Sequence, residues 1–111
     1  MKVAALDLGT NTFLCLIAEV EGGEITDIYS DQVESVRLGQ GVNKTKNFHP
    51  EALARARSCL ERFSKTIEAE QPESVLAMAT SAARDVTNSE ELFQICKDFF
   101  FGIFYKLWFI L

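Results

Sequence analysis

The chain has 111 residues, of which 48% are hydrophobic and 24% charged, and its formal net charge at pH 7 is −5. This length allows one domain with a modest core, and the composition is typical of a globular protein rather than a disordered one. The acidic balance argues against a dedicated duplex nucleic-acid partner, since proteins of that class are usually basic. It does not exclude a phosphate-bearing ligand, because backbone N–H groups and a few arginines can hold an anion.

The cysteines and the histidine give no sign of a metal or redox centre. Cys15, Cys59 and Cys96 are odd in number and far apart, and each lies in an apolar pattern, which predicts buried free thiols. His49 has no cysteine or histidine at ligand spacing, so we expect it at the surface or at a helix start. The N-terminus lacks the features of a secretory signal peptide, and we therefore expect a reducing, cytoplasmic setting.

The first predicted unit is a hairpin. Residues 3–8 and 13–19 are apolar at nearly every position, which predicts two strands covered on both faces. A polar turn separates them, in which glycine allows backbone dihedrals that a side chain would forbid. Successive N–H groups and hydroxyls in such a turn can point at one phosphate. The candidate phosphate-binding residues of this turn are Gly9, Thr10, Asn11 and Thr12.

Asp7 ends the first strand just before this turn. It could hold a hydrated Mg²⁺, because that ion keeps most of its waters and needs few protein carboxylates. The alternative for the whole hairpin is a plain β-turn in which Asn11 and the threonines bond their own backbone.

A third strand over residues 25–38 is predicted at a sheet edge, since its alternation is only partial and one face would be wet. It leads into a loop with two glycines, Gly39 and Gly41. Arg37 precedes this loop and could pair with a phosphate. The alternative is a solvated arginine at a strand end, which is the more common case.

Residues 43–47 are polar, and we expect them to form a mobile loop. Pro50 then opens a helix that ends before Gln71. Apolar residues recur at spacings of three and four, which predicts one buried face, and the charged residues are expected on a solvated face. The predicted buried residues are Leu53, Ala56, Leu60, Phe63 and Ile67, and the predicted solvated ones are Arg55, Glu61, Arg62, Lys65 and Glu68.

Residues 74–79 are predicted to form a strand that returns to the sheet parallel to a neighbour. The loop that follows lies at the carboxyl end of a parallel strand, where α/β folds usually place their ligands. In this loop Thr80 and Ser81 could donate to a phosphate and Arg84 could clamp one. The alternative is that Arg84 pairs with Asp85 or with another carboxylate.

Asn88 has the spacing of a capping residue for a second helix, whose predicted buried residues are Leu92, Ile95, Cys96 and Phe99. The composition then changes abruptly, because residues 99–111 are apolar except for Gly102 and Lys106. This stretch is shorter than the roughly 20 residues that a membrane-spanning helix needs. It could be a buried strand, an interfacial anchor or an aggregation-prone end.

Three segments, residues 7–12, 37–42 and 79–85, in this order and spacing, resemble the beginning of the exopolyphosphatase / guanosine pentaphosphate phosphatase (Ppx/GppA) family. That family belongs to the actin, Hsp70 and sugar kinase superfamily. The resemblance covers residues 1–98, and the second and third segments are its specific part. It implies an α/β fold, with a ribonuclease-H-like mixed sheet of about five strands flanked by helices, which is half of an actin-like ATPase fold.

The resemblance also implies an activity, namely the removal of terminal phosphoryl groups from polyphosphate or guanosine pentaphosphate (pppGpp) with Mg²⁺. Asp7 would be the catalytic residue on the side of the metal or the attacking water. The remaining residues would bind substrate phosphates: Gly9, Thr10, Asn11, Thr12, Arg37, Ser81 and Arg84.

The chain departs from the family pattern after its second predicted helix. The Gly-Glu-Glu-Ala-like segment that carries the general base and the later Asp-x-Gly-Gly-Gly-Ser-like loop are both absent from these residues. We therefore expect a truncated N-terminal lobe over residues 1–99 with an atypical apolar tail over 100–111, inactive alone and lacking its second domain.

Two other functions stay open. One is a non-enzymatic phosphate- or nucleotide-binding module, which could form a homodimer or dock on a membrane surface through its tail. The other is the N-terminal lobe of a sugar or acyl kinase, although the loop at residues 80–85 argues against it.

Overall fold

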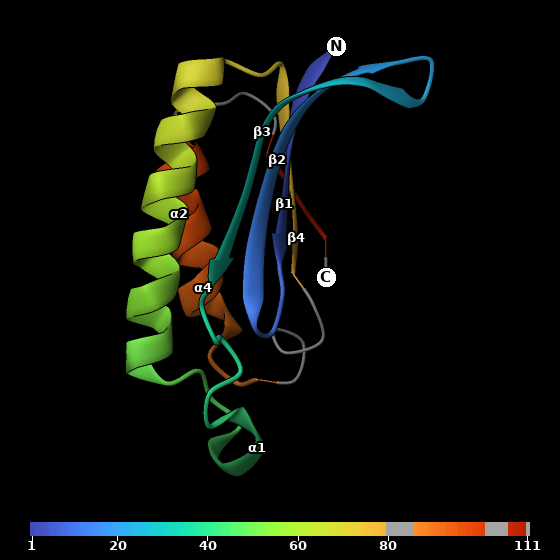
Figure 1. The fold of residues 1–111 in the computed structure, drawn as a ribbon. Helices are drawn as coiled ribbons and strands as arrows, with labels where there is room; N and C mark the ends of the chain where they lie inside the picture. Colours follow the sequence, from blue (N-terminus) through green and yellow to red (C-terminus); the bar gives the residue numbers. More distant parts are fainter. Residues whose placement is uncertain (80–85, 102–106, 111) are drawn as a thin grey trace.

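A computed structural model describes residues 1–79, 86–101 and 107–110 of the chain (Figure 1). Ser81 and Arg84, two of the predicted phosphate-binding residues, lie outside the described residues. The elements are β1 (Lys2–Leu8), β2 (Thr12–Glu21), β3 (Glu24–Ser35), α1 (Val42–Thr45), α2 (Pro50–Glu70), β4 (Ser74–Ala79), α4 (Ser89–Cys96), the π-helical η1 (Lys97–Phe101) and β5 (Leu107–Ile110).

The strands form one mixed sheet in the order β3-β2-β1-β4-β5. β1 pairs antiparallel with β2, and β2 pairs antiparallel with β3. β4 returns through α2 to pair parallel with β1, and β5 pairs parallel with β4. The α/β, ribonuclease-H-like class predicted for the chain is confirmed, including the crossover that makes β4 parallel to its neighbour.

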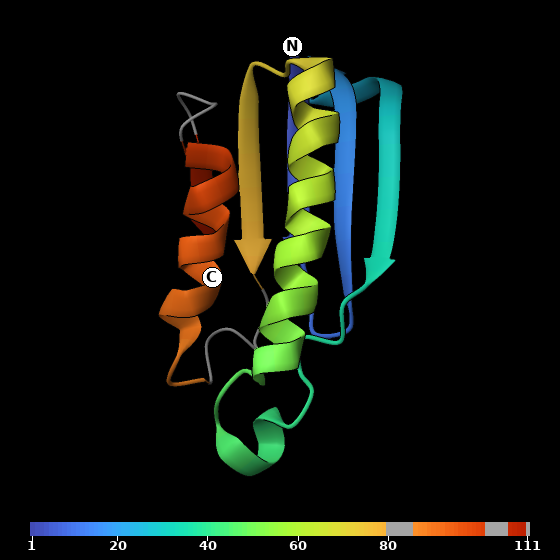
Figure 2. The same cartoon turned by 90° about the vertical axis from the view of Figure 1, so that its left-hand side faces the viewer.

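The helices α2 and α4 lie side by side on one face of this sheet (Figures 1 and 2). The prediction that β1 and β2 are covered on both faces is therefore wrong for the described part of the chain. Leu6 and Leu8 are fully buried under the helices, whereas Leu14 and Met78 on the other face are 36% and 40% exposed. Both faces of these strands are apolar in sequence, and which face is covered depends on where the helices pack.

β3 lies at the sheet edge, as its partial alternation predicts. It ends at Ser35 rather than at residue 38, because the chain turns away from β2 there. The N–H groups of Val36 and Arg37 both donate to the carbonyl of Asn11, at 2.9 and 2.8 Å. The side chains of Val36 and Leu38 are buried, which draws this segment toward the core.

α2 spans Pro50–Glu70, as the sequence pattern predicts, and begins with the Nδ1 of His49 accepting the N–H of Glu51 at 3.1 Å. His49 therefore has the helix-start role expected for it. The predicted buried residues of α2 are buried except Leu53, which is partly exposed. Cys59, predicted to be a buried thiol, is also buried on this helix, and burial extends further than predicted, to Ala52 and Ser64.

Two features between the elements were not predicted from the sequence. Val42–Thr45 make the short helix α1, which starts after Gly41 in a left-handed conformation (φ 72°). Asn88 precedes α4 as predicted, but its side chain does not cap the helix backbone. Its Oδ1 instead accepts the N–H of Phe48 at 2.8 Å, which ties α4 to the start of α2.

Candidate phosphate-binding site

The turn between β1 and β2 is closed by a hydrogen bond from the N–H of Gly9 to the carbonyl of Thr12, at 3.0 Å. A Cβ at Gly9 would lie 2.7 Å from that carbonyl oxygen, closer than real Cβ atoms approach. The backbone of Gly9 is not in the left-handed region. Glycine is therefore required here because the turn leaves no space for a side chain, and not for the dihedral freedom predicted from the sequence.

The turn is docked against the segment that follows β3, which we call the 36–40 segment. The carbonyl of Asn11 accepts two N–H groups from it, and the carbonyl of Thr10 accepts the N–H of Gly39 at 3.0 Å. A Cβ at Gly39 would lie 2.6 Å from the Cγ2 of Thr10, so the Gly39 backbone packs directly against the Thr10 side chain. Two segments that are separated in sequence by β2 and β3 are thus joined at one end of the sheet.

Arg37 lies at this junction. Its backbone is in the left-handed region, with φ of 52°, a conformation that costs about 1–2 kcal/mol for a residue with a side chain. The side chain is exposed, and within the described residues no hydrogen bond or ion pair engages its guanidinium. Non-glycine residues in this conformation cluster at functional sites, where surrounding contacts hold them.

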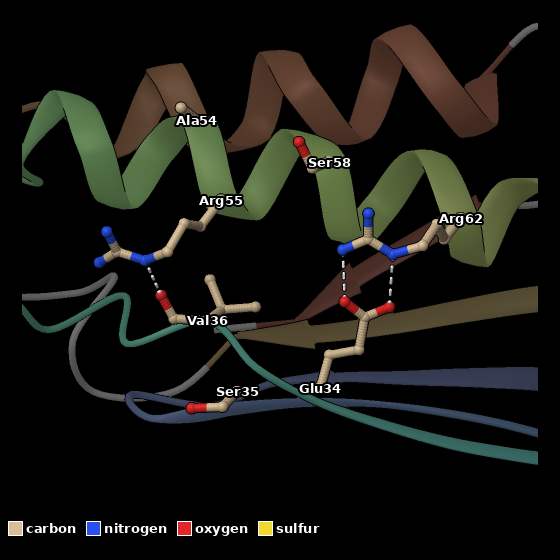
Figure 3. A pocket seen from close by; sticks show the side chains of 7 residues that line it. All are labelled: Glu34, Ser35, Val36, Ala54, Arg55, Ser58 and Arg62. Atoms are coloured by element: carbon tan, nitrogen blue, oxygen red, sulfur yellow. Dashed lines mark hydrogen bonds and ion pairs between the residues drawn. The ribbon is translucent and has the colours of Figure 1, made fainter.

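The contacts that hold Arg37 come from α2. The Nε of Arg55 donates to the carbonyl of Val36 at 2.7 Å (Figure 3). Its Nη2 donates to the carbonyl of Arg37 at 3.1 Å. The prediction that Arg55 belongs to the solvated face of α2 is therefore wrong. The sequence contained a signal, because Arg55 follows Ala52 by three residues and precedes Cys59 by four, and both are buried.

Asp7 lies on the face of the sheet away from α2, opposite Leu14 on β2 and Met78 on β4. Its side chain is half-buried among these apolar neighbours, and it makes no hydrogen bond or ion pair with any residue that the structure describes. No group of three metal-ligating side chains occurs in the described part of the chain. A single unpaired carboxylate fits a hydrated Mg²⁺, which is usually held by one or two carboxylates together with substrate phosphates.

The remaining turn residues, Thr10, Asn11 and Thr12, are exposed at the same end of the sheet. The last pair of the β1–β4 ladder joins Leu8 to Ala79, so β4 ends beside the start of the turn. The structure thus brings the turn and the backbone of Arg37 together, and Asp7 lies near the end of β1 on the face of the sheet away from α2. The turn carries hydroxyls and an amide, and Arg37 carries a guanidinium, which are groups that can bind an anion.

A groove of about 360 Å³ lies between the end of β3 and α2 (Figure 3). Its charged groups already have partners, since Arg62 forms a two-point ion pair with Glu34 that includes an Nε–Oε2 hydrogen bond of 2.9 Å. The Arg62 guanidinium holds the pKa of the Glu34 carboxyl below its usual value. Both arginines of this groove are therefore already engaged with groups of the protein. The groove is lined by Glu34, Ser35, Val36, Ala54, Arg55, Ser58 and Arg62.

The cysteines contribute no chemistry to the site. Cys15, Cys59 and Cys96 are free and buried, as predicted. Burial raises the pKa of each thiol to about 12, so none of them forms a thiolate at neutral pH.

No helix among the described residues is long and apolar enough to cross a membrane.

The sheet order and the docked turn define the class as a ribonuclease-H-like lobe of the actin-like ATPase fold. A model of the Ppx/GppA phosphatase family matches residues 16–103, and the chain belongs to this family. Exopolyphosphatase 2 of Mycobacterium tuberculosis is 43% identical over 101 residues, which cover 87% of this chain and 31% of the relative.

Solved structures agree. An exopolyphosphatase-like protein superposes with a TM-score of 0.85 at 34% identity, covering 99% of this chain and 32% of the other. The Ppx/GppA family member of Aquifex aeolicus gives a TM-score of 0.82 at 26% identity, covering 98% and 35%. The chain therefore spans about a third of the length of these relatives.

Proposed function

We propose that this chain is the N-terminal lobe of an enzyme that removes terminal phosphoryl groups from polyphosphate or pppGpp, and that it forms one wall of the phosphate site. The observation that carries the proposal is the docking of the Asp7 turn against the 36–40 segment, with Asn11 accepting the N–H of Arg37 at 2.8 Å. This backbone contact supports the proposal, because Arg37 is an exposed arginine and the turn carries hydroxyls and an amide. The names of similar proteins in Mycobacterium tuberculosis and Haemophilus influenzae, which describe exopolyphosphatases, support polyphosphate as the substrate.

In this proposal the turn residues and Arg37 bind and orient a phosphate group. Phosphoryl transfer depends mainly on positioning and charge neutralisation, and a guanidinium can bind two phosphate oxygens at once. Ser81 and Arg84 are proposed to add to the same wall, because they follow Ala79, which pairs with Leu8. Gly9 contributes by allowing the turn to close.

Asp7 is proposed to hold the divalent cation, Mg²⁺. A bound Mg²⁺ would neutralise charge on the phosphate oxygens and so favour phosphoryl transfer. The carboxylate of Asp7 is suited to this role because it is half-buried and has no partner among the described residues.

We also propose that the chain binds polyphosphate without hydrolysing it. Its residues contain neither the glutamate segment nor the second glycine-rich loop that the family resemblance implies, and a further domain or a second copy would supply them. The alternative of a non-enzymatic phosphate-binding or oligomerising module predicts the same binding. The kinase alternative is disfavoured by the family match.

Two assays on the chain as it stands test this proposal. Titration calorimetry with tripolyphosphate and Mg²⁺ should show binding, and Arg37→Gln should weaken it about tenfold, as expected for the loss of one charge-assisted contact. Arg57→Gln is the matched control, because Arg57 is an exposed arginine of α2 that pairs with Asp98 away from the turn. Equal affinity in both variants would show that the anion site is not at Arg37.

The second assay is phosphate release from long-chain polyphosphate with Mg²⁺. We expect no release from the chain alone. Steady release that disappears in Asp7→Asn would refute binding without hydrolysis, and it would show that the missing groups are replaced within this chain or its oligomer.

A further inference from the structure

Arg55 holds the 36–40 segment by three hydrogen bonds from one guanidinium. Two go to the carbonyls of Val36 and Arg37, at 2.7 and 3.1 Å, and the third goes from Nη2 to the Oε1 of Gln40 at 2.5 Å. The Arg55 side chain is half-buried and reaches from α2 toward the end of β3 (Figure 3). Within the part of the chain that the structure describes, its hydrogen bonds all go to the segment that carries Arg37.

The same segment is held from its other side by the turn. The N–H groups of Val36 and Arg37 donate to Asn11, and the N–H of Gly39 donates to Thr10. Arg55 binds the carbonyls of the segment, and the turn binds its N–H groups. The peptide units on both sides of Arg37 are therefore fixed by hydrogen bonds from two directions. Within β3 and the 36–40 segment, Arg37 is the one non-glycine residue with a positive φ.

We infer that Arg55 is a positioning residue that holds Arg37 in its left-handed conformation, so that the Arg37 side chain leaves the backbone next to the phosphate-binding turn. This inference rests on the proposed function, because Arg37 is assigned to the substrate there. Without the Arg55 contacts the segment keeps its hydrogen bonds to the turn but loses the partners of its carbonyls, which help to offset the cost of this conformation.

The guanidinium is required for its shape as well as its charge. A planar fork with several N–H groups can reach two carbonyls and an amide oxygen together, whereas a lysine ammonium is a single point of charge. Arg55→Lys therefore keeps the charge of α2 and removes the geometry. Arg62→Lys is the matched control, because Arg62 lies on the same helix and lines the same groove but pairs with Glu34 instead.

The test measures tripolyphosphate affinity by calorimetry for Arg55→Lys, Arg62→Lys, Arg37→Gln and the double variant of Arg55 and Arg37. We expect Arg55→Lys to weaken binding about fivefold to tenfold, approaching the loss of one charge-assisted contact, and Arg62→Lys to leave it within about twofold. In the Arg37→Gln background, Arg55→Lys should have no further effect, because Arg55 acts through Arg37.

If Arg55 positions Arg37, amide hydrogen exchange in Arg55→Lys should accelerate at Val36 and Arg37, while the amides of β1 stay as protected as in the unchanged protein. A purely structural role would produce a different pattern, in which the amides of β1 lose protection as well. If Arg55→Lys does not fold, Arg55→Gln, which keeps one donor group, takes its place in the same comparison.

The outcomes separate this inference from the proposed function. Affinity that falls in Arg37→Gln but not in Arg55→Lys would overturn the inference and leave the proposed site intact. An equal further loss in the double variant would also overturn it, because Arg55 would then act independently of Arg37. No effect of Arg37→Gln would overturn the proposed site, and the inference with it.

Discussion

Replacing Gly39 by alanine tests whether the turn and the 36–40 segment are docked as closely as the structure shows. The added Cβ would lie 2.6 Å from the Cγ2 of Thr10, so one of the two must move. The Gly39 backbone itself is not in the left-handed region, and alanine is therefore strained only by this contact. The change tests one interatomic distance rather than a backbone preference.

The magnitude follows from opposing effects. Overpacking a close contact costs about 1–3 kcal/mol, and weakening the Gly39–Thr10 hydrogen bond of 3.0 Å adds about 1 kcal/mol. Replacing glycine by alanine also restricts the unfolded chain, which returns about 0.4–1 kcal/mol. We expect Gly39→Ala to lower the free energy of unfolding by about 1–3.5 kcal/mol, measured by urea denaturation followed by circular dichroism.

Thr10→Ser provides the decisive comparison, because it removes the Cγ2 and keeps the hydroxyl. In that background the Cβ added by Gly39→Ala has no methyl group to meet, and we expect at least half of the destabilisation to disappear. A double-mutant cycle reports this coupling directly. The same loss of stability with and without the Thr10 methyl group would refute the close approach, and with it the geometry on which the phosphate site depends.

Two further predictions concern stability. Phe63→Ala, at a fully buried position of α2, should lower the free energy of unfolding by about 3–5 kcal/mol in urea, whereas the exposed Lys65→Ala on the same helix should change it little. The Glu34–Arg62 pair should make the free energy of unfolding depend on pH, because the pKa of Glu34 is lower in the folded protein than in the unfolded chain, where it is near 4.3. The stabilisation from the pair is present above the unfolded pKa and is lost as the pH falls through the folded pKa. Urea midpoints of Glu34→Gln and the unchanged protein should therefore differ above about pH 5 and converge in acid, and a constant difference across this range would contradict the pairing.

Much of the fold could be predicted from local patterns. Pro50 and the spacing of Leu60, Phe63 and Ile67 defined α2 correctly, because helix starts and apolar periodicity depend on neighbours within a few residues. The same holds for β4, a short apolar run after a helix. The three motifs at residues 7–12, 37–42 and 79–85 were sufficient to indicate the family to which the chain belongs.

The contacts between residues far apart in sequence were decided only by the tertiary structure. β1 and β2 are apolar on both faces, and the packing of α2 and α4 determined which face is buried. Arg55 has the charge of a solvated residue, and its role follows from the position of the Val36 and Arg37 carbonyls. Hydrogen bonds and close contacts of this kind depend on distances between elements, which local propensity and spacing do not contain.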